Sequence, residues 1–179
     1  MNTTEIRVTY DALARAAQTG SFQPDSADEW PTEKIVAHAI ATNQTLNRVG
    51  IELLDGRRDV SYEGGTLSVR DEWLDSIIDA AGDLEGLVTY LRHSYGELLA
   101  LADRCDEDTS NRKFHGRIFD GKGNIQLEAD MSFADIVARY LVRHMRNHTR
   151  QIDSLVVAGH VSRYPSLIHR EAVTTGQTE

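Results

Sequence analysis

The fold expected for this chain follows from residues 133–157, which read FADIVARYLVRHMRNHTRQIDSLVV. Apolar side chains recur there at spacings of three and four residues, which places them on one face of an α-helix. The stripe consists of Phe133, Val137, Tyr140, Leu141, His144, His148, Ile152 and Leu155. Two histidines therefore occupy positions at which such a helix carries core residues.

His144 and His148 call for a chemical explanation, because an apolar face rarely carries two imidazoles one turn apart. Side chains at i and i+4 are neighbours on a helix, so both rings can reach one metal ion. Satisfied interior histidines or a polar helix face would give the same spacing. His38 is likewise an imidazole at a core position, in a second apolar stripe. That stripe is Ile35, His38, Thr42, Thr45, Leu46, Val49 and Leu53. A divalent metal site of His38, His144 and His148 would explain all three placements.

Four helical segments are expected, at residues 4–19, 31–54, 74–102 and 132–158. Each carries apolar residues at helical spacing. The connection at 56–70 is long enough to span a helix bundle, which indicates that the second and third helices run in the same direction. The sequence therefore predicts an all-α protein, a four-helix bundle with a long crossover between its second and third helices.

The connection between the third and fourth helices contains turn-forming residues at 120–124. Residues 117–119 and 125–127 flank them, which is typical of a short hairpin or an ordered loop. The helical domain is expected over residues 1–160. The remaining residues, 161–179, are expected to form a polar C-terminal tail.

Composition narrows the class of protein. The 179 residues suffice for one domain with a sizeable core. The net charge of −9 argues against nucleic acid as a partner, because a phosphate backbone requires a basic surface. Cys105 is the single cysteine, so no intramolecular disulfide can form. No apolar run has the length of a membrane span, and the N-terminus lacks a signal-peptide core. We expect a cytoplasmic protein that acts on a small-molecule substrate, with neither nucleic acid nor membrane as partner.

Two stretches resemble the DinB/YfiT-like superfamily, which includes mycothiol-dependent maleylpyruvate isomerases and bacillithiol-linked transferases. The first is WPTEKIVAH at residues 30–38, a tryptophan shortly before a helix that carries a histidine. The second is LVRHMRNHTRQI at residues 141–152, two histidines four apart and then Gln-Ile. The resemblance implies a four-helix bundle of up-down-down-up order. It also implies a divalent metal ion held by His38, His144 and His148, with an open coordination position that faces a pocket.

The ligand set limits the chemistry of the expected site. Three neutral imidazoles leave a divalent ion its full charge, which lowers the pKa of a bound water or thiol. Zn, Ni and Fe all accept histidine ligands, so the sequence does not distinguish them. Met145 follows His144, whereas the helical zinc-protease pattern requires glutamate there, so a peptidase of that type is not expected.

Two functions are compatible with these features. One is a metal-dependent transferase that adds a low-molecular-weight thiol to a small electrophile, or a related metal hydrolase. The other is a non-catalytic metal or small-molecule binding module that forms a homodimer through its bundle. Several polar residues could assist the site in either case. Thr42, Asn147 and Gln151 lie near the histidines on helical wheels and could orient them. Tyr95 and Tyr140 lie on core stripes and could place a hydroxyl at the pocket, or could be ordinary core tyrosines.

Overall fold

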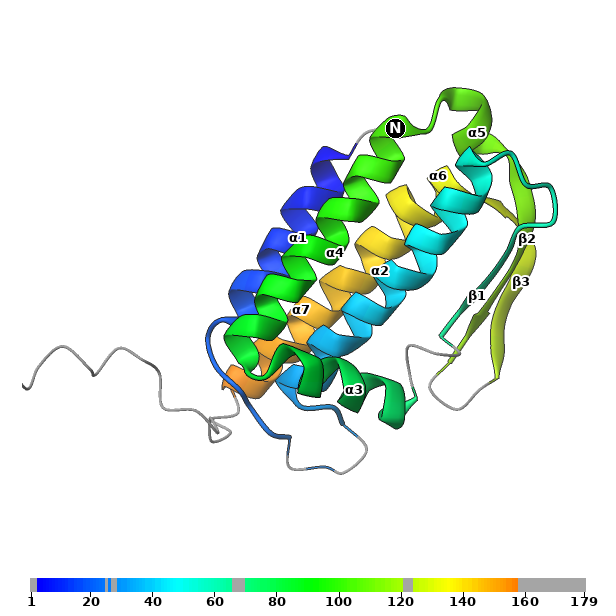
Figure 1. Ribbon diagram of the computed structural model, residues 1–179. Coiled ribbons are helices and arrows are strands. Elements are labelled where there is room, and N and C mark those ends of the chain that lie inside the picture. The colour runs from blue at the N-terminus through cyan, green and yellow to red at the C-terminus, as the bar shows by residue number, and fades with distance from the viewer. Residues whose placement is uncertain (1–2, 25, 27–28, 66–69, 121–123, 158–179) are drawn as a thin grey trace, which may run out of the picture.

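A computed structural model describes residues 3–24, 26, 29–65, 70–120 and 124–157. Within them, long helices lie side by side and a three-stranded sheet runs along one side of the helices (Figure 1). The long helices are α1 (Thr4–Ala17), α2 (Thr32–Leu54), α4 (Leu84–Arg104) and α7 (Val142–Val157). The shorter ones are α3 (Asp71–Ala81), α5 (Glu107–Asn111), α6 (Phe133–Asp135) and the π-helical segment η1 (Ile136–Leu141). The strands are β1 (Ser61–Gly64), β2 (Lys113–Phe119) and β3 (Ile125–Ser132).

The sheet makes the protein mixed α/β, so the prediction of an all-α four-helix bundle is wrong. β1 lies in the expected crossover and pairs in parallel with β2. β2 and β3 pair antiparallel and occupy the stretch where a short hairpin or a loop was expected. The physical reason is that the backbone N–H and C=O groups of both connections bond to each other in a ladder. The sequence pattern indicated only the pair of β2 and β3, and of that pair only residues 117–119 and 125–127.

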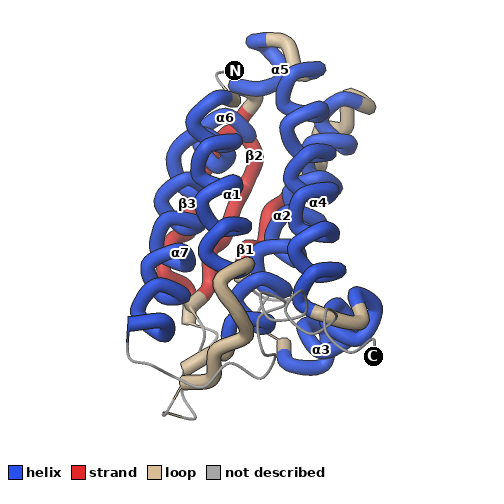
Figure 2. The backbone as a smooth tube through the Cα atoms, turned by 90° about the vertical axis from the view of Figure 1, so that its left-hand side faces the viewer, coloured by secondary structure: helices blue, strands red, loops and turns tan. Residues whose placement is uncertain are grey.

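The connection through β1 also sets the direction of the helices. α2 and α4 run the same way, because β1 returns the chain along the length of α2 before α3 and α4 begin (Figure 1). Figure 2, turned by 90°, shows the strands behind the helices. The sheet is therefore a second layer against one side of the helical layer.

The helix expected at 74–102 is in fact two helices, α3 and α4. Gly82 separates them with a φ of +80°, a conformation that favours glycine. Asp83 then caps α4, because its carboxylate accepts a hydrogen bond of 2.7 Å from the backbone N–H of Gly86. The apolar stripe continues across the break, since Leu74 and Ile77 of α3 are buried like the stripe of α4. Periodicity alone therefore could not show the break.

The sheet presents one face to the helices. Tyr62 of β1 and Ile118 of β2 are buried, with exposed fractions of 1% and 2%. β3 lies at the edge, and its residues 125–130 are exposed. No helix within the described residues is long and apolar enough to cross a membrane. The tail expected at 161–179 lies outside the described residues.

Candidate metal centre

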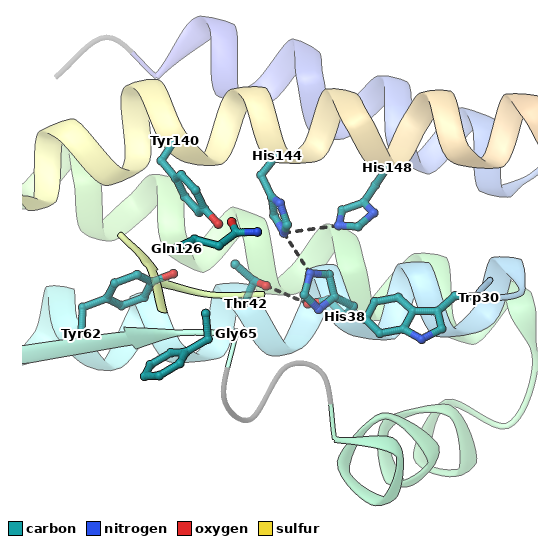
Figure 3. A pocket seen from close by; sticks show the side chains of 10 residues that line it. Trp30, His38, Thr42, Tyr62, Gly65, Gln126, Tyr140, His144 and His148 are labelled. Atoms are coloured by element: carbon teal, nitrogen blue, oxygen red, sulfur yellow. Dashed lines mark hydrogen bonds between the residues drawn. The ribbon is translucent and has the colours of Figure 1, made fainter. Parts of the chain in front are cut away.

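Three histidines meet between two helices. His38 lies in the first half of α2, and His144 and His148 lie on α7. Figure 3 shows the rings of His144 and His148 pointing from their helix toward the ring of His38. The i, i+4 spacing on α7 brings its two rings together, and the packing of α7 against α2 adds the third.

The distances between the rings suit ligands of a single ion. Nε2 of His144 lies 2.8 Å from Nε2 of His38 and 3.3 Å from Nε2 of His148. One ligand nitrogen from each histidine lies within 4.8 Å of the other two. Nitrogens bound to one zinc ion at about 2.1 Å and at angles of about 90–110° lie roughly 3.0–3.4 Å apart. The three histidines therefore lie close enough to bind a metal ion.

Burial disfavours protonation of the two histidines on α7. His38 and His148 are only 4% and 9% exposed. Burial, and then the neighbouring His148 and His38, lower the pKa of His144 to about 2. Burial also lowers the pKa of His148, against the opposing effect of its hydrogen bond to Gln151. Neutral imidazoles have a free nitrogen lone pair, which is the form that binds metals.

Neighbouring side chains fix the orientation of the rings. Nδ1 of His148 lies 3.1 Å from Oε1 of Gln151, and donation of the Nδ1 proton to that oxygen leaves the lone pair on Nε2. The ring of Tyr140 stacks on His144 with centroids 5.5 Å apart, and Trp30 packs against His38 at 5.1 Å. Each imidazole is thus held by a neighbour outside the cluster.

A cavity of about 270 Å³ opens beside the histidines. Its lining combines residues of α2, η1 and α7 with residues of the sheet (Figure 3). The lining residues are Trp30, His38, Thr42, Tyr62, Gly65, Phe119, Gln126, Tyr140, His144 and His148. Aromatic, imidazole, hydroxyl and amide groups therefore face the cavity, and no Asp, Glu, Lys or Arg side chain is present among the described residues of its lining.

The sequence suggested five polar residues that could orient the histidines or place a hydroxyl at the pocket, and the structure divides them into two groups. Tyr140 and Thr42 line the cavity, and Gln151 bonds to His148. Asn147 is exposed and accepts a hydrogen bond from Arg150, and Tyr95 donates its hydroxyl hydrogen bond to Asp11 on α1. These last two residues do not reach the cavity.

Sequence analysis missed the residues that the sheet brings to the cavity. They are Tyr62, Phe119 and Gln126, which follow no helical period. The alternation of buried Val60, Tyr62 and Gly64 is the one local sign of the strand that carries Tyr62. It spans so few residues that a connecting loop fits it equally well.

Two other histidines lie in the described residues. His93 and His115 are both exposed, and His115 pairs with Glu128 at 3.1 Å.

Comparisons with models of protein families, with curated proteins and with solved structures gave no significant match. The site must therefore be interpreted from its own geometry.

Proposed function

We propose that His38, His144 and His148 bind a divalent metal ion, and that the protein is a metal-dependent transferase of a low-molecular-weight thiol to a small electrophile. The observation that carries the proposal is the convergence of three histidine side chains on the wall of a cavity of about 270 Å³. The resemblance of the two histidine segments to the DinB/YfiT-like superfamily supports it. The all-α fold that the resemblance implied does not support the proposal, because the structure contains a three-stranded sheet.

The ion, when bound, would lower the pKa of a bound thiol so that the thiolate forms near neutral pH. Two residues of the chain favour the form of the histidines that binds a metal ion. The low pKa of His144 keeps its lone pair available, and Gln151 holds His148 in the matching tautomer.

Thiol transfer fits the lining better than hydrolysis does. A metal hydrolase commonly uses a carboxylate or an imidazole beside the ion as general base. The described lining offers imidazoles only, and all three are assigned to the ion. A bound thiol depends less on a neighbouring base than a bound water does, because its ordinary pKa of about 8.5 is far below that of water and its proton can pass to solvent.

A non-catalytic metal or small-molecule binding module is the second candidate. The same lining favours it, since an uncharged aromatic cavity can bind a ligand without transforming it. Turnover separates the two candidates, because the binding module leaves its ligand unchanged.

The experiment is metal analysis of the purified protein, followed by a screen of common thiols against model electrophiles in the presence of Zn²⁺, Ni²⁺ or Fe²⁺. We expect about one ion per chain in the wild type, loss of the ion in His148→Ala, and retention in His93→Ala. The control is matched because His93 is an exposed histidine on α4, away from the cluster. Thiol transfer should depend on the ion and disappear in His148→Ala. Metal binding without turnover would favour the binding module, and failure to bind any of the three metals would refute the metal-dependent transferase.

A further inference from the structure

Two tyrosine hydroxyls face the cavity and form no hydrogen bond to any residue that the structure describes. Tyr62 on β1 and Tyr140 on η1 both line the cavity. Figure 3 shows their hydroxyl groups directed into the same space, with the amide of Gln126 beside them. Within the part of the chain that the structure describes, neither hydroxyl makes a hydrogen bond to another residue. A tyrosine hydroxyl that faces a cavity without a protein partner can donate a hydrogen bond to a ligand bound there.

The fold holds both rings in place. A Cβ atom at Gly64 would lie 2.5 Å from the hydroxyl oxygen of Tyr62 and 2.7 Å from its Cε1 atom. The ring of Tyr62 therefore occupies the space that a side chain at position 64 would fill. The ring of Tyr140 stacks on His144, at an angle of 15° between the ring planes. Both hydroxyls are thus positioned before any ligand arrives.

These hydroxyls act as hydrogen-bond donors. A tyrosine hydroxyl, with an ordinary pKa of about 10, keeps its proton at neutral pH and can donate a hydrogen bond. Among the described residues that line the cavity, none has a cationic side chain that could neutralise a carboxylate or phosphate. An uncharged acceptor such as a carbonyl oxygen fits two neutral donors without an uncompensated buried charge.

We infer that Tyr62 and Tyr140 form a carbonyl-binding subsite, and that the ligand of this cavity is a small uncharged carbonyl compound. The identification of this ligand as the electrophile of the transfer reaction rests on the proposed function. The subsite itself does not, because it consists of groups that are present without a metal ion.

The test is the binding of a matched pair of probes, acetophenone and α-methylstyrene, followed by chemical-shift changes in nuclear magnetic resonance spectra. The two molecules have nearly the same shape, but only acetophenone carries a carbonyl oxygen. We expect wild-type protein to prefer acetophenone about tenfold, the factor expected from two hydrogen bonds to a buried acceptor. Tyr62→Phe/Tyr140→Phe should lose this preference and keep its affinity for α-methylstyrene. Tyr95→Phe is the control, because its hydroxyl bonds to Asp11 away from the cavity.

Measurements with and without Zn²⁺ separate this inference from the proposed function. A preference that persists in metal-free protein and disappears in the double variant supports the subsite even if metal binding fails. A preference that requires Zn²⁺ and survives in the double variant would place the carbonyl on the ion and overturn the inference. Equal affinity of the wild type for both probes would also overturn it. If the double variant does not fold, each single variant should lose part of the preference, and an unchanged preference in both would be decisive against the subsite.

Discussion

At the scale of single residues, the protein places neutral histidines where most proteins place aliphatic side chains. His144 packs between His38, His148 and Tyr140. An imidazole in such surroundings costs stability when it takes up a proton, because the charged form loses its water and faces other imidazoles. This cost should make the free energy of unfolding depend on pH through His144.

We expect the free energy of unfolding of the metal-free protein to fall as the pH drops below about 6.5. The unfolded state then binds a proton at His144, whereas the folded state does not until its pKa of about 2 is reached. The loss amounts to at most ~1.4 kcal/mol per pH unit for this residue. Urea unfolding between pH 7.5 and pH 5 should show a smaller slope in His144→Gln. Equal slopes in the wild type and in His144→Gln would contradict the prediction.

A second residue-scale prediction concerns the buried contact between α1 and α2. The hydroxyl of Tyr10 donates to Oδ1 of Asn43, whose amide donates to Oγ of Ser94 at 2.9 Å. Tyr10 and Asn43 are both fully buried. Asn43→Ala should destabilise the protein by about 1–3 kcal/mol, because it leaves the hydroxyl of Tyr10 unpaired. Addition of Tyr10→Phe to that variant should cost less than Tyr10→Phe costs in the wild type. Thermal unfolding of the four proteins measures the difference, and strictly additive effects would show that the pair is not coupled.

At the scale of elements, backbone conformation decides where α3 ends and α4 begins. Gly82 and Gly96 form a matched pair, since a Cβ atom at either would have no neighbour within 4 Å outside its own helix. Gly82 has a φ of +80° between the two helices, and Gly96 lies within α4. Only backbone conformation therefore distinguishes the two substitutions.

Gly96→Ala should stabilise the protein by about 0.5–1 kcal/mol, because alanine has the higher helix propensity. Gly82→Ala should destabilise it by roughly 1 kcal/mol, because an L-residue is strained at that φ. Denaturant unfolding of both variants tests the sign of each effect. Stabilisation by Gly82→Ala would mean that α3 and α4 join into one helix in solution.

At the scale of the whole molecule, one core formed by helices and sheet supports the site. Buried apolar side chains come from every long helix and from β1 and β2. A domain of this size commonly has about 5–15 kcal/mol of stability from such packing. The histidine cluster therefore need not hold the fold together.

We expect the protein to remain folded after treatment with a chelator, with an unchanged helical signal in circular dichroism and a cooperative melt. Added Zn²⁺ should raise the melting temperature of the wild type, because it binds the folded state. His148→Ala should fold normally but show no shift with Zn²⁺. Loss of most helical signal on metal removal would instead make the metal a structural component and would rule out the catalytic interpretation.

Much of the helical part of the structure was encoded locally. The stripes around His38 and around His144 and His148 predicted helices that bury one face, because helical spacing is a property of neighbouring residues. The same stripes predicted that the three histidines point inward. Their convergence within 4.8 Å is a property of the structure, since it depends on how α2 and α7 pack.

The sheet and the cavity were decided by tertiary structure. β1 pairs with β2 across a large sequence separation, with Ser61 opposite His115, and no local pattern specifies such a partner. β3 is exposed over residues 125–130, so it lacks the alternation of a half-buried strand. The π-helical turns of η1, which carry Tyr140, also depart from the spacing that sequence periodicity assumes. The sequence by itself therefore determined the inward-facing histidines, whereas long-range strand pairing determined the wall of the cavity that they face.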